Sequence, residues 1–380
     1  MIYMDSAATT PVKPEVLRAM WPYFSDAYGN PSSRHALGDA AARALAEARA
    51  RVATVLGCRP KEIVFTSGGT EADNLAIKGI ALANPRGRHI VTAATEHEAV
   101  LASCDYLVRH HGFEITYAQV DPYGTVLPEA FERALRPDTA LASIMLANNE
   151  VGTLEPVREL ANLARARGIP FHTDAVQAAG ALDLNVDALG VDALSLSGHK
   201  IGAPKGVGIL YLRRRVAAEP VVHGGGQESG RRSGTENVAG AVAFATALEI
   251  ATADREARVA RLRELRDRLI AGVLQHVPGA VLTGHPTDRL PGHASFCFAG
   301  TSGESVLLAL EERGILCSSG SACAAGSDEP SHVLVAMGIG RELAQTAVRF
   351  SFTDELSSAD IDTVIRSVSE AVRALSALAS

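Results

Sequence analysis

Short apolar runs alternate with longer segments of helical spacing through most of the chain. The apolar runs occupy residues 63–66, 90–92, 141–146, 169–173 and 193–196, and one of the helices between them is expected over 71–83. Strands that are apolar on both faces are typical of a parallel sheet covered by helices on each side. The pattern therefore predicts an α/β protein with a mostly parallel sheet.

The pattern changes near residue 254. A highly charged helix follows, with an apolar stripe made of Val259, Leu262, Leu265, Leu269 and Val273. After it come shorter β and α segments separated by glycines. We expect a large domain over residues 13–254 and a smaller α+β domain made of residues 1–12 and 255–380.

Composition narrows the class of protein. The chain has 380 residues, of which 47% are hydrophobic and 21% are charged, as in globular enzymes. Its net charge of −7 argues against direct binding of nucleic acid through a broad basic surface. The most apolar stretch, 241–253, is too short to cross a membrane, and residues 1–5 do not resemble a secretory signal. We expect a cytoplasmic protein.

The cysteines are scattered, odd in number and never spaced as C-x-x-C. This number and spacing of cysteines argue against a disulfide framework and against a zinc site, so no metal is expected. Cys323 lies in a run of small residues, 318–327, which suits an accessible thiolate that travels between two reaction partners. The alternative role, an inert core cysteine, is favoured for the other four, Cys58, Cys104, Cys297 and Cys317.

Polar residues directly after the predicted strands are the candidate ligand-binding residues, because ligands gather at the carboxyl ends of strands in such sheets. In the segment 67–71, glycines let the backbone approach an anion at a helix N-terminus, which makes Gly69 and Thr70 candidate phosphate ligands. An ordinary turn with Thr70 as N-cap is the alternative.

A lysine, a carboxylate and an anion cradle on successive strand ends meet the needs of pyridoxal phosphate (PLP) chemistry. Asp174 suits a protonated pyridine nitrogen, although helix capping is an alternative for it. Gln177 suits the phenolic oxygen of the ring. Lys200 is the candidate Schiff-base lysine, with Lys205 as a competitor. Ser197 and His199 beside Lys200 suit the phosphate.

Two further residues carry candidate roles. His97 follows a strand, where it can stack on a planar ring or shuttle protons, and a structural role is the alternative. Arg349 is a charge inside the alternating strand pattern of residues 348–352. An arginine there either reaches solvent or binds a carboxylate in a bidentate manner, such as that of an amino-acid substrate.

Taken together, these residues resemble the cysteine desulfurases of the class-V aminotransferase group of PLP enzymes. The motifs that carry the resemblance lie at residues 5–10, 29–33, 197–200, 232–235, 318–323, 329–332 and 349–351. The resemblance implies the fold-type I transferase architecture, in which a mostly parallel seven-stranded sheet is sandwiched by helices and joined by a smaller α+β domain.

The resemblance also implies a role for each matching residue. Lys200 would form the Schiff base, with Asp174 on the pyridinium and Gln177 on the phenolic oxygen. His97 would stack over the ring, and Asn149 would position the substrate and the cofactor. The phosphate would be held by Gly69, Thr70, Ser197 and His199, with Thr235 reaching it from the second subunit of a homodimer. Arg349 and Asn30 would bind the substrate carboxylate.

The implied reaction removes sulfur from L-cysteine, which leaves L-alanine and a persulfide on Cys323. An acceptor protein, either an iron–sulfur scaffold or a tRNA thiolation enzyme, would then take the sulfur, and Cys323 would contact an iron–sulfur cluster during transfer. The alternatives are a selenocysteine lyase, a class-V aminotransferase, and a degenerate fold that serves as a docking platform. The sequence leaves the acceptor and the preference for cysteine over selenocysteine open.

Overall fold

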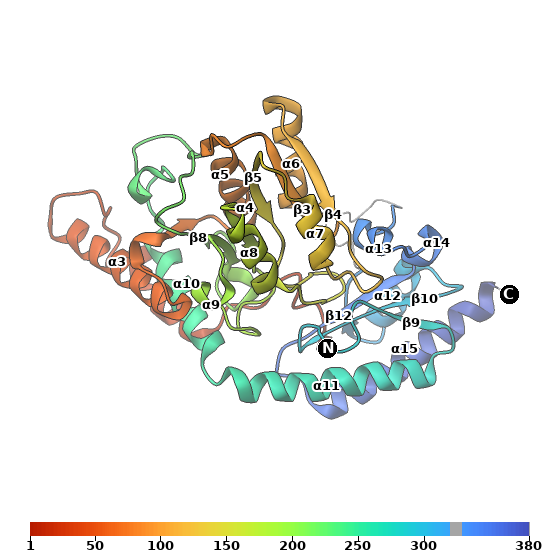
Figure 1. The fold of residues 1–380 in the computed structure, drawn as a ribbon. Coiled ribbons are helices and arrows are strands. Elements are labelled where there is room, and N and C mark those ends of the chain that lie inside the picture. The colour runs from red at the N-terminus through yellow and green to blue at the C-terminus, as the bar shows by residue number, and fades with distance from the viewer. Residues whose placement is uncertain (320–328, 380) are drawn as a thin grey trace.

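The structure, a computed structural model, describes residues 1–319 and 329–379. Its largest sheet has seven strands (Figure 1). Their spatial order is β2 (Ile63–Thr66), β8 (Gly208–Leu212), β7 (Ala193–Ser197), β6 (Phe171–Asp174), β5 (Thr139–Ser143), β3 (His89–Ala93) and β4 (Glu114–Ala118). β8 runs antiparallel to both of its neighbours, and the other pairs are parallel. The predicted α/β fold is therefore confirmed.

The strands are buried on both faces because helices cover each face of the sheet. One face carries Phe65, Val91 and Leu194, which pack in a cluster with the helices α3 (Ala36–Leu56), α8 (Val157–Ala166) and α10 (Val238–Thr252). The other face carries the alternate residues Val64 and Ile90, which pack with the helices α4 (Gly69–Asn74), α5 (Ile80–Ala83) and α6 (Glu98–His111). Within this sheet the edge strand β4 is the exception, because Glu114 and Tyr117 are exposed and Ile115 and Thr116 are half-buried.

The helices of this part are α1 (Pro14–Met20), α2 (Pro22–Ser25), α3 (Ala36–Leu56), α4 (Gly69–Asn74), α5 (Ile80–Ala83), α6 (Glu98–His111), α7 (Pro128–Ala134), α8 (Val157–Ala166), α9 (Val186–Leu189) and α10 (Val238–Thr252). A π-helical stretch, Leu75–Gly79, joins α4 to α5 where a single regular helix is predicted. Such bulges occur often near functional sites. Among the described residues, no helix is long and apolar enough to cross a membrane.

A second hydrophobic cluster lies apart from the first and contains Leu262, Leu265, Phe350 and Met4. Its elements are α11 (Arg255–His276), β9 (Ala280–Thr283), β10 (His293–Phe298), α12 (Gly303–Glu311), β12 (Ala347–Ser351) and α15 (Ser358–Ala379). The short helices α13 (His332–Ala336) and α14 (Arg341–Ala344) flank it, and α11 and α15 lie side by side along the bottom of Figure 1. The two clusters support the proposed division into two domains, which stays a prediction.

The N-terminal residues belong to this second cluster although they begin the chain. β1 (Ile2–Tyr3) pairs in parallel with β11 (Ile315–Leu316), and Met4 is fully buried. The chain then crosses to the large sheet, where the backbone of Thr10 bonds to that of His199. The first residues thus connect the small core with the carboxyl ends of the large sheet.

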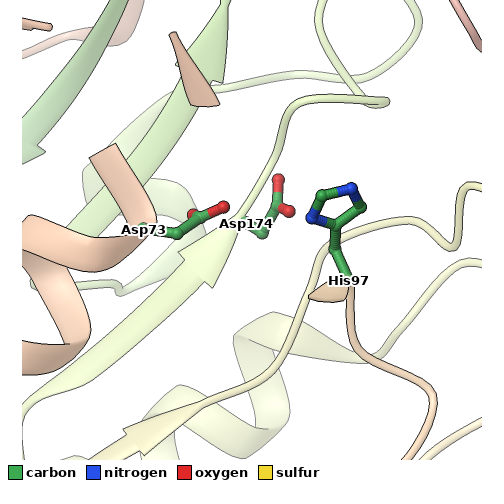
Figure 2. Close-up of side chains that lie close together, drawn as sticks. All are labelled: Asp73, His97 and Asp174. Carbon is green, nitrogen blue, oxygen red and sulfur yellow. The ribbon is translucent and has the colours of Figure 1, made fainter. Parts of the chain in front are cut away.

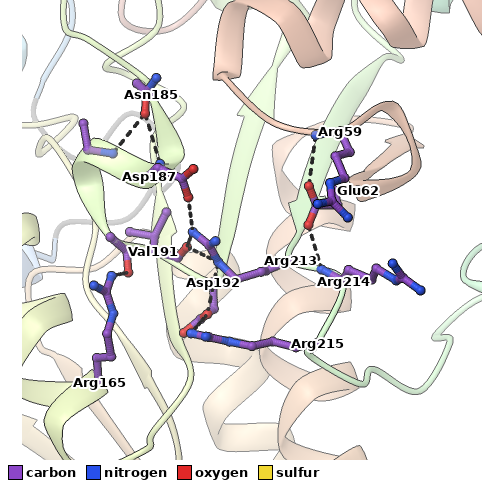
Figure 3. A network of polar contacts seen from close by, with 12 residues as sticks. Arg59, Glu62, Arg165, Asn185, Asp187, Val191, Asp192, Arg213, Arg214 and Arg215 are labelled. Carbon is purple, nitrogen blue, oxygen red and sulfur yellow. Dashed lines mark hydrogen bonds and ion pairs between the residues drawn. The ribbon is translucent and has the colours of Figure 1, made fainter.

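A polar network ties the sheet together at the opposite edge (Figure 3). Arg213, directly after β8, pairs with Asp187 at 2.9 Å and with Asp192 at 3.4 Å, and Arg215 contacts Asp192 at 3.0 Å. Glu62 accepts a hydrogen bond from the backbone of Arg214. These contacts fix the antiparallel β8 against the loop before β7, and β7 is the strand that leads to Lys200.

Candidate active site

The candidate residues converge because their strands end at the same edge of the sheet. Asp174 is the last residue of β6, and Ser197 is the last residue of β7. Lys200 ends the 3-10 turn Gly198–Lys200 that follows β7. His97 is the N-cap of α6 after β3, where its Nδ1 accepts a hydrogen bond from the backbone of Ala99. The structure therefore brings these four predicted residues to one edge.

Asp174 is buried beside a histidine and a lysine. Its Oδ1 accepts a hydrogen bond from the backbone of Val176 at 2.9 Å, and the side chain points towards His97 (Figure 2). Burial raises the pKa of Asp174, whereas His97 and Lys200 act to lower it. A cationic ring nitrogen at this position would supply the partner that a buried carboxylate needs. No helix starts at Asp174, so the capping alternative does not apply.

Lys200 points to the N-terminal segment. Its Nζ donates to the carbonyl oxygens of Ala7 and Ala8, the latter at 2.8 Å, and Gln177 Nε2 donates to the same Ala7 oxygen at 3.0 Å. Lys200 and Gln177 thus meet at one backbone group. Lys205 is exposed, whereas Lys200 is half-buried, so Lys205 is the weaker candidate for the Schiff-base lysine.

The glycine segment before α4 faces Ser197. A Cβ atom added at Gly69 would lie 2.9 Å from Val176 Cγ2 and 3.5 Å from Ser197 Cβ, so a larger residue would fill this space. His199 Nδ1 lies 3.2 Å from the hydroxyl of Thr9, and burial lowers the pKa of His199 to about 4. Glycine backbone, a serine hydroxyl and a neutral imidazole form a donor set that fits a phosphate.

Arg349 is held rigidly in the middle of β12. Its Nη2 pairs with Asp5 Oδ1 at 2.9 Å, and its Nη1 donates to the backbone oxygen of Asn149 at 3.0 Å. Its Nε is buried, and among the described residues it finds no hydrogen-bond partner. A buried donor without a partner is costly unless a ligand supplies an acceptor. The arginine therefore suits a carboxylate, and it brings Asn149 to the same place.

Two predicted site residues, Asn30 and Thr235, form no polar contact with the other candidate residues within the described part of a single chain. Asn30 is exposed and accepts a hydrogen bond from Ser32 in its own turn. Thr235 is exposed too, although its neighbour Arg232 pairs with Glu71 at the start of α4 at 2.7 Å. Among the described residues, neither Asn30 nor Thr235 forms a hydrogen bond or ion pair with the residues around Lys200 and Arg349.

Cys323 lies outside the described residues, but both flanks of its segment contact the site. Ser318 and Arg349 exchange backbone hydrogen bonds on one side. On the other side, the hydroxyl of Ser331 donates to Glu150, and the imidazole of His332 lies 2.9 Å from the backbone oxygen of Glu96. The described residues on the two sides of Cys323 therefore contact Arg349, Glu150 and Glu96.

The other cysteines are poor nucleophiles. Burial raises the pKa of Cys58, Cys104 and Cys317 to about 12 and that of Cys297 to about 11. A thiol with such a pKa is protonated at neutral pH, and only the thiolate is reactive. These four residues behave as the core cysteines that the sequence predicts.

Sequence reasoning did not identify Asp5, Glu150 and Asp73 as residues of this site. Asp73 lies on the inner face of α4 and is buried beside Asp174 (Figure 2). The only signal in the sequence is a charged residue between Ala72 and the apolar residues of the following π-helical stretch. A charge on the buried face of a helix is unusual unless it has a partner.

The sequence of the chain matches a known family of proteins. The family model of class-V aminotransferases matches residues 2–364. The chain is 49% identical over 375 residues to a protein of Methanosarcina thermophila named cysteine desulfurase IscS, covering 98% of this chain and 92% of the relative. It is 48% identical to a protein of the same name from Dictyoglomus turgidum, covering 92% of this chain and 89% of that one.

Solved structures of similar proteins have the same fold. A NifS-like protein superposes with a TM-score of 0.92 at 38% identity, covering 98% of this chain and all (100%) of that one. The structure described as SspA in complex with cysteine superposes with a TM-score of 0.81 at 36% identity, covering 93% and 99% of the two chains. Fold and site thus define an α/β enzyme of the aminotransferase type. The chain belongs to the class-V aminotransferase family and, within it, to the cysteine desulfurases.

Proposed function

We propose that the protein is a PLP-dependent cysteine desulfurase that releases L-alanine from L-cysteine and carries the sulfur as a persulfide on Cys323. The observation that carries this proposal is the convergence of Lys200 and Asp174 at one edge of the sheet, beside a glycine segment that leaves room for an anion. The family is PLP-dependent, and the donor set described above fits the cofactor.

Each candidate residue has a place in this scheme. Asp174 would hold the ring nitrogen, Gln177 would hold the phenolic oxygen, and His97 would stack on the ring. The phosphate is held by Gly69, Thr70, Ser197 and His199, with Thr235 contributed by a second copy of the chain in a homodimer. When bound, the cofactor supplies an electron-accepting ring conjugated to the amino nitrogen of the substrate.

The remaining steps belong to the side chains of this protein. Arg349 and Asn149, with Asn30, hold the carboxylate of L-cysteine. Lys200 is the base that moves the proton at the Cα atom. The Cys323 thiolate attacks the substrate sulfur, so a sulfur–sulfur bond forms while the carbon–sulfur bond breaks. The electron pair stays with the carbon fragment, which is protonated to alanine.

The persulfide is then delivered. A thiolate on an acceptor protein attacks the outer sulfur of Cys323, as in thiol–disulfide exchange. The acceptor is an iron–sulfur scaffold or a tRNA thiolation enzyme, and in the first case Cys323 contacts the cluster during transfer. Free cysteines fit a reducing compartment, so we propose that this exchange takes place in the cytoplasm.

The experiment that tests the proposal measures alanine and sulfide released from L-cysteine by the purified holoenzyme in the presence of a reductant. Equal amounts of the two products are expected. Cys323→Ala should keep the bound cofactor and lose sulfide release, whereas Cys58→Ala, remote from the site, should keep both. Release from L-selenocysteine alone would favour a selenocysteine lyase, and formation of a keto acid would favour an aminotransferase. Full activity of Cys323→Ala would refute the persulfide role.

A further inference from the structure

A second carboxyl group, Asp73, lies behind Asp174. Asp73 is 1% exposed, and among the described residues its Oδ1 has no hydrogen-bond partner. Polar atoms of Asp73, His97 and Asp174 all lie within 4.8 Å of one another, and Figure 2 shows the two carboxyl groups in line towards the imidazole.

Two carboxyl groups this close in a dry site do not both ionise, because the like charges repel each other and each is deprived of water. The pair therefore holds one proton over a wide range of pH and titrates in two steps that belong to both residues. The question is which of the two residues keeps the proton.

The surroundings of Asp174 favour the charged form there. It accepts a backbone hydrogen bond from Val176 and faces His97 and Lys200. Asp73 faces two acidic groups instead, Asp174 and Glu96, and against them the Ser195 hydroxyl acts to lower its pKa. Burial and then Asp174 raise the pKa of Asp73 well above its usual range. The proton therefore stays on Asp73.

A chain of neutral groups supports Asp73 from the sheet. His172 Nδ1 lies 2.9 Å from the Ser143 hydroxyl, and its Nε2 lies 2.9 Å from that of Ser195 and 3.7 Å from Asp73 Oδ1. Burial lowers the pKa of His172 to about 3, so this imidazole is uncharged at neutral pH. His172 therefore offers Asp73 no positive charge, and the network can fix its orientation without ionising it.

Two carboxyl groups and an imidazole are also a known ligand set for divalent metals. Here Lys200 acts on the same carboxylate, and its positive charge disfavours a metal ion at that place. A shared proton fits these surroundings better than a cation.

We propose that Asp73 is a positioning residue that keeps the shared proton of the pair, so that Asp174 alone carries the negative charge that faces the cofactor. This inference rests on the proposed function, because it gives Asp174 the ring nitrogen as its partner. A neutral Asp73 also supports the orientation of Asp174 from behind. Removing the carboxyl group should therefore disturb cofactor binding, whereas a neutral side chain of the same shape should not.

The test compares Asp73→Asn with Asp73→Ala in the full-length protein, with Asp105→Asn as a matched control on the exposed face of α6. The measured quantity is the dissociation constant of PLP from the apoprotein. Asp73→Asn should keep this dissociation constant within about threefold of the wild-type value. Asp73→Ala should raise the dissociation constant about tenfold or more. If Asp73 were ionised, Asn would remove a charge that attracts the cofactor and would weaken binding as much as Ala, which would overturn the proposal.

An infrared difference spectrum between the wild-type apoprotein and Asp73→Asn gives an independent measurement at neutral pH. The C=O stretch of a protonated carboxyl group should disappear in the variant and persist in Asp105→Asn. Loss of an ionised-carboxylate band instead would refute the proposal even if Ala fails to fold. Neither measurement uses turnover. A wild-type enzyme that releases no alanine would therefore contradict the proposed function without deciding the state of Asp73.

Discussion

Asp5 and Arg349 form an ion pair 2.9 Å long that joins the first residues of the chain to the last strand of the small sheet. Arg349 is almost fully buried, and the same guanidinium also binds the backbone of Asn149. The pair fixes the arginine in place before any substrate arrives. Because the guanidinium is already oriented, binding a carboxylate there costs less entropy.

Loss of this orientation should appear in substrate binding. Asp5→Asn should raise the KM for L-cysteine about fivefold with little change in kcat, because Asn keeps a weaker, uncharged contact with Arg349. Arg349→Lys should reduce kcat/KM about a hundredfold, since a lysine does not bind a carboxylate in a bidentate manner. Steady-state kinetics would check both values, and an unchanged KM in Arg349→Lys would contradict the assigned role.

Replacement of the candidate lysine distinguishes Lys200 from Lys205. Lys200→Ala should lose the visible absorbance of the bound cofactor and all desulfuration, because Lys200 is the lysine that acts on the buried Asp174. Lys205→Ala, which changes an exposed residue, should keep both. Absorption spectra of the two purified variants provide the check, and the opposite pattern would move the role to Lys205.

Asp174→Asn should separate chemistry from binding. A neutral amide holds the ring nitrogen without keeping it charged, so kcat should fall at least about a hundredfold while the dissociation constant of PLP rises less than about tenfold. Single-turnover kinetics with a fluorescence titration of the cofactor would measure both effects. Equal losses would mean that Asp174 acts mainly as a structural anchor.

The contact between Ser331 and Glu150 should matter for sulfur transfer. Ser331→Ala removes the hydroxyl that donates to the buried Glu150 at one flank of the Cys323 segment. Persulfide formation should slow about fivefold, because the contact between Ser331 and Glu150 helps to position the segment that carries Cys323. The affinity for PLP should stay unchanged. Rapid-quench measurement of the Cys323 persulfide tests this, with Ser357→Ala at the exposed start of α15 as the control.

Buried histidines should limit stability in acid. Burial lowers the pKa of His172 and His293 to about 3, below the ordinary value of about 6.5 that the unfolded chain retains. The unfolded state therefore binds more protons between these values, and the free energy of unfolding should fall as the pH drops from about 6.5 towards 3. Denaturant unfolding at several pH values would measure the slope. His293→Gln, which keeps a donor for the Glu150 backbone oxygen, should reduce it.

Local sequence was enough to predict several elements. The strand expected over residues 63–66 is β2, and the lysine, the carboxylate and the glycine segment do meet at one edge, because parallel strands end together. The strand expected over 141–146 ends at Ser143, although Ile144 and Leu146 still bond to the backbone of β6. Apolar character alone does not reveal where a chain leaves a sheet.

Contacts between distant residues were beyond the reach of the sequence pattern. The pairing of Asp5 with Arg349, the carbonyl groups that receive Lys200, and the burial of Asp73 all depend on how separate elements pack. No local spacing encodes these relationships. The choice between Lys200 and Lys205 was open for the same reason, and burial favours Lys200.

The position of the first residues has a consequence for biosynthesis. The partner of Asp5 lies 344 positions further along the chain, so this ion pair cannot form until Arg349 has left the ribosome, whereas Thr10 can already bond to His199. The large sheet, whose strands all precede Arg349 in the chain, can assemble during translation before this ion pair forms. The ion pair between Asp5 and Arg349 therefore forms only after every strand of the large sheet has been synthesised.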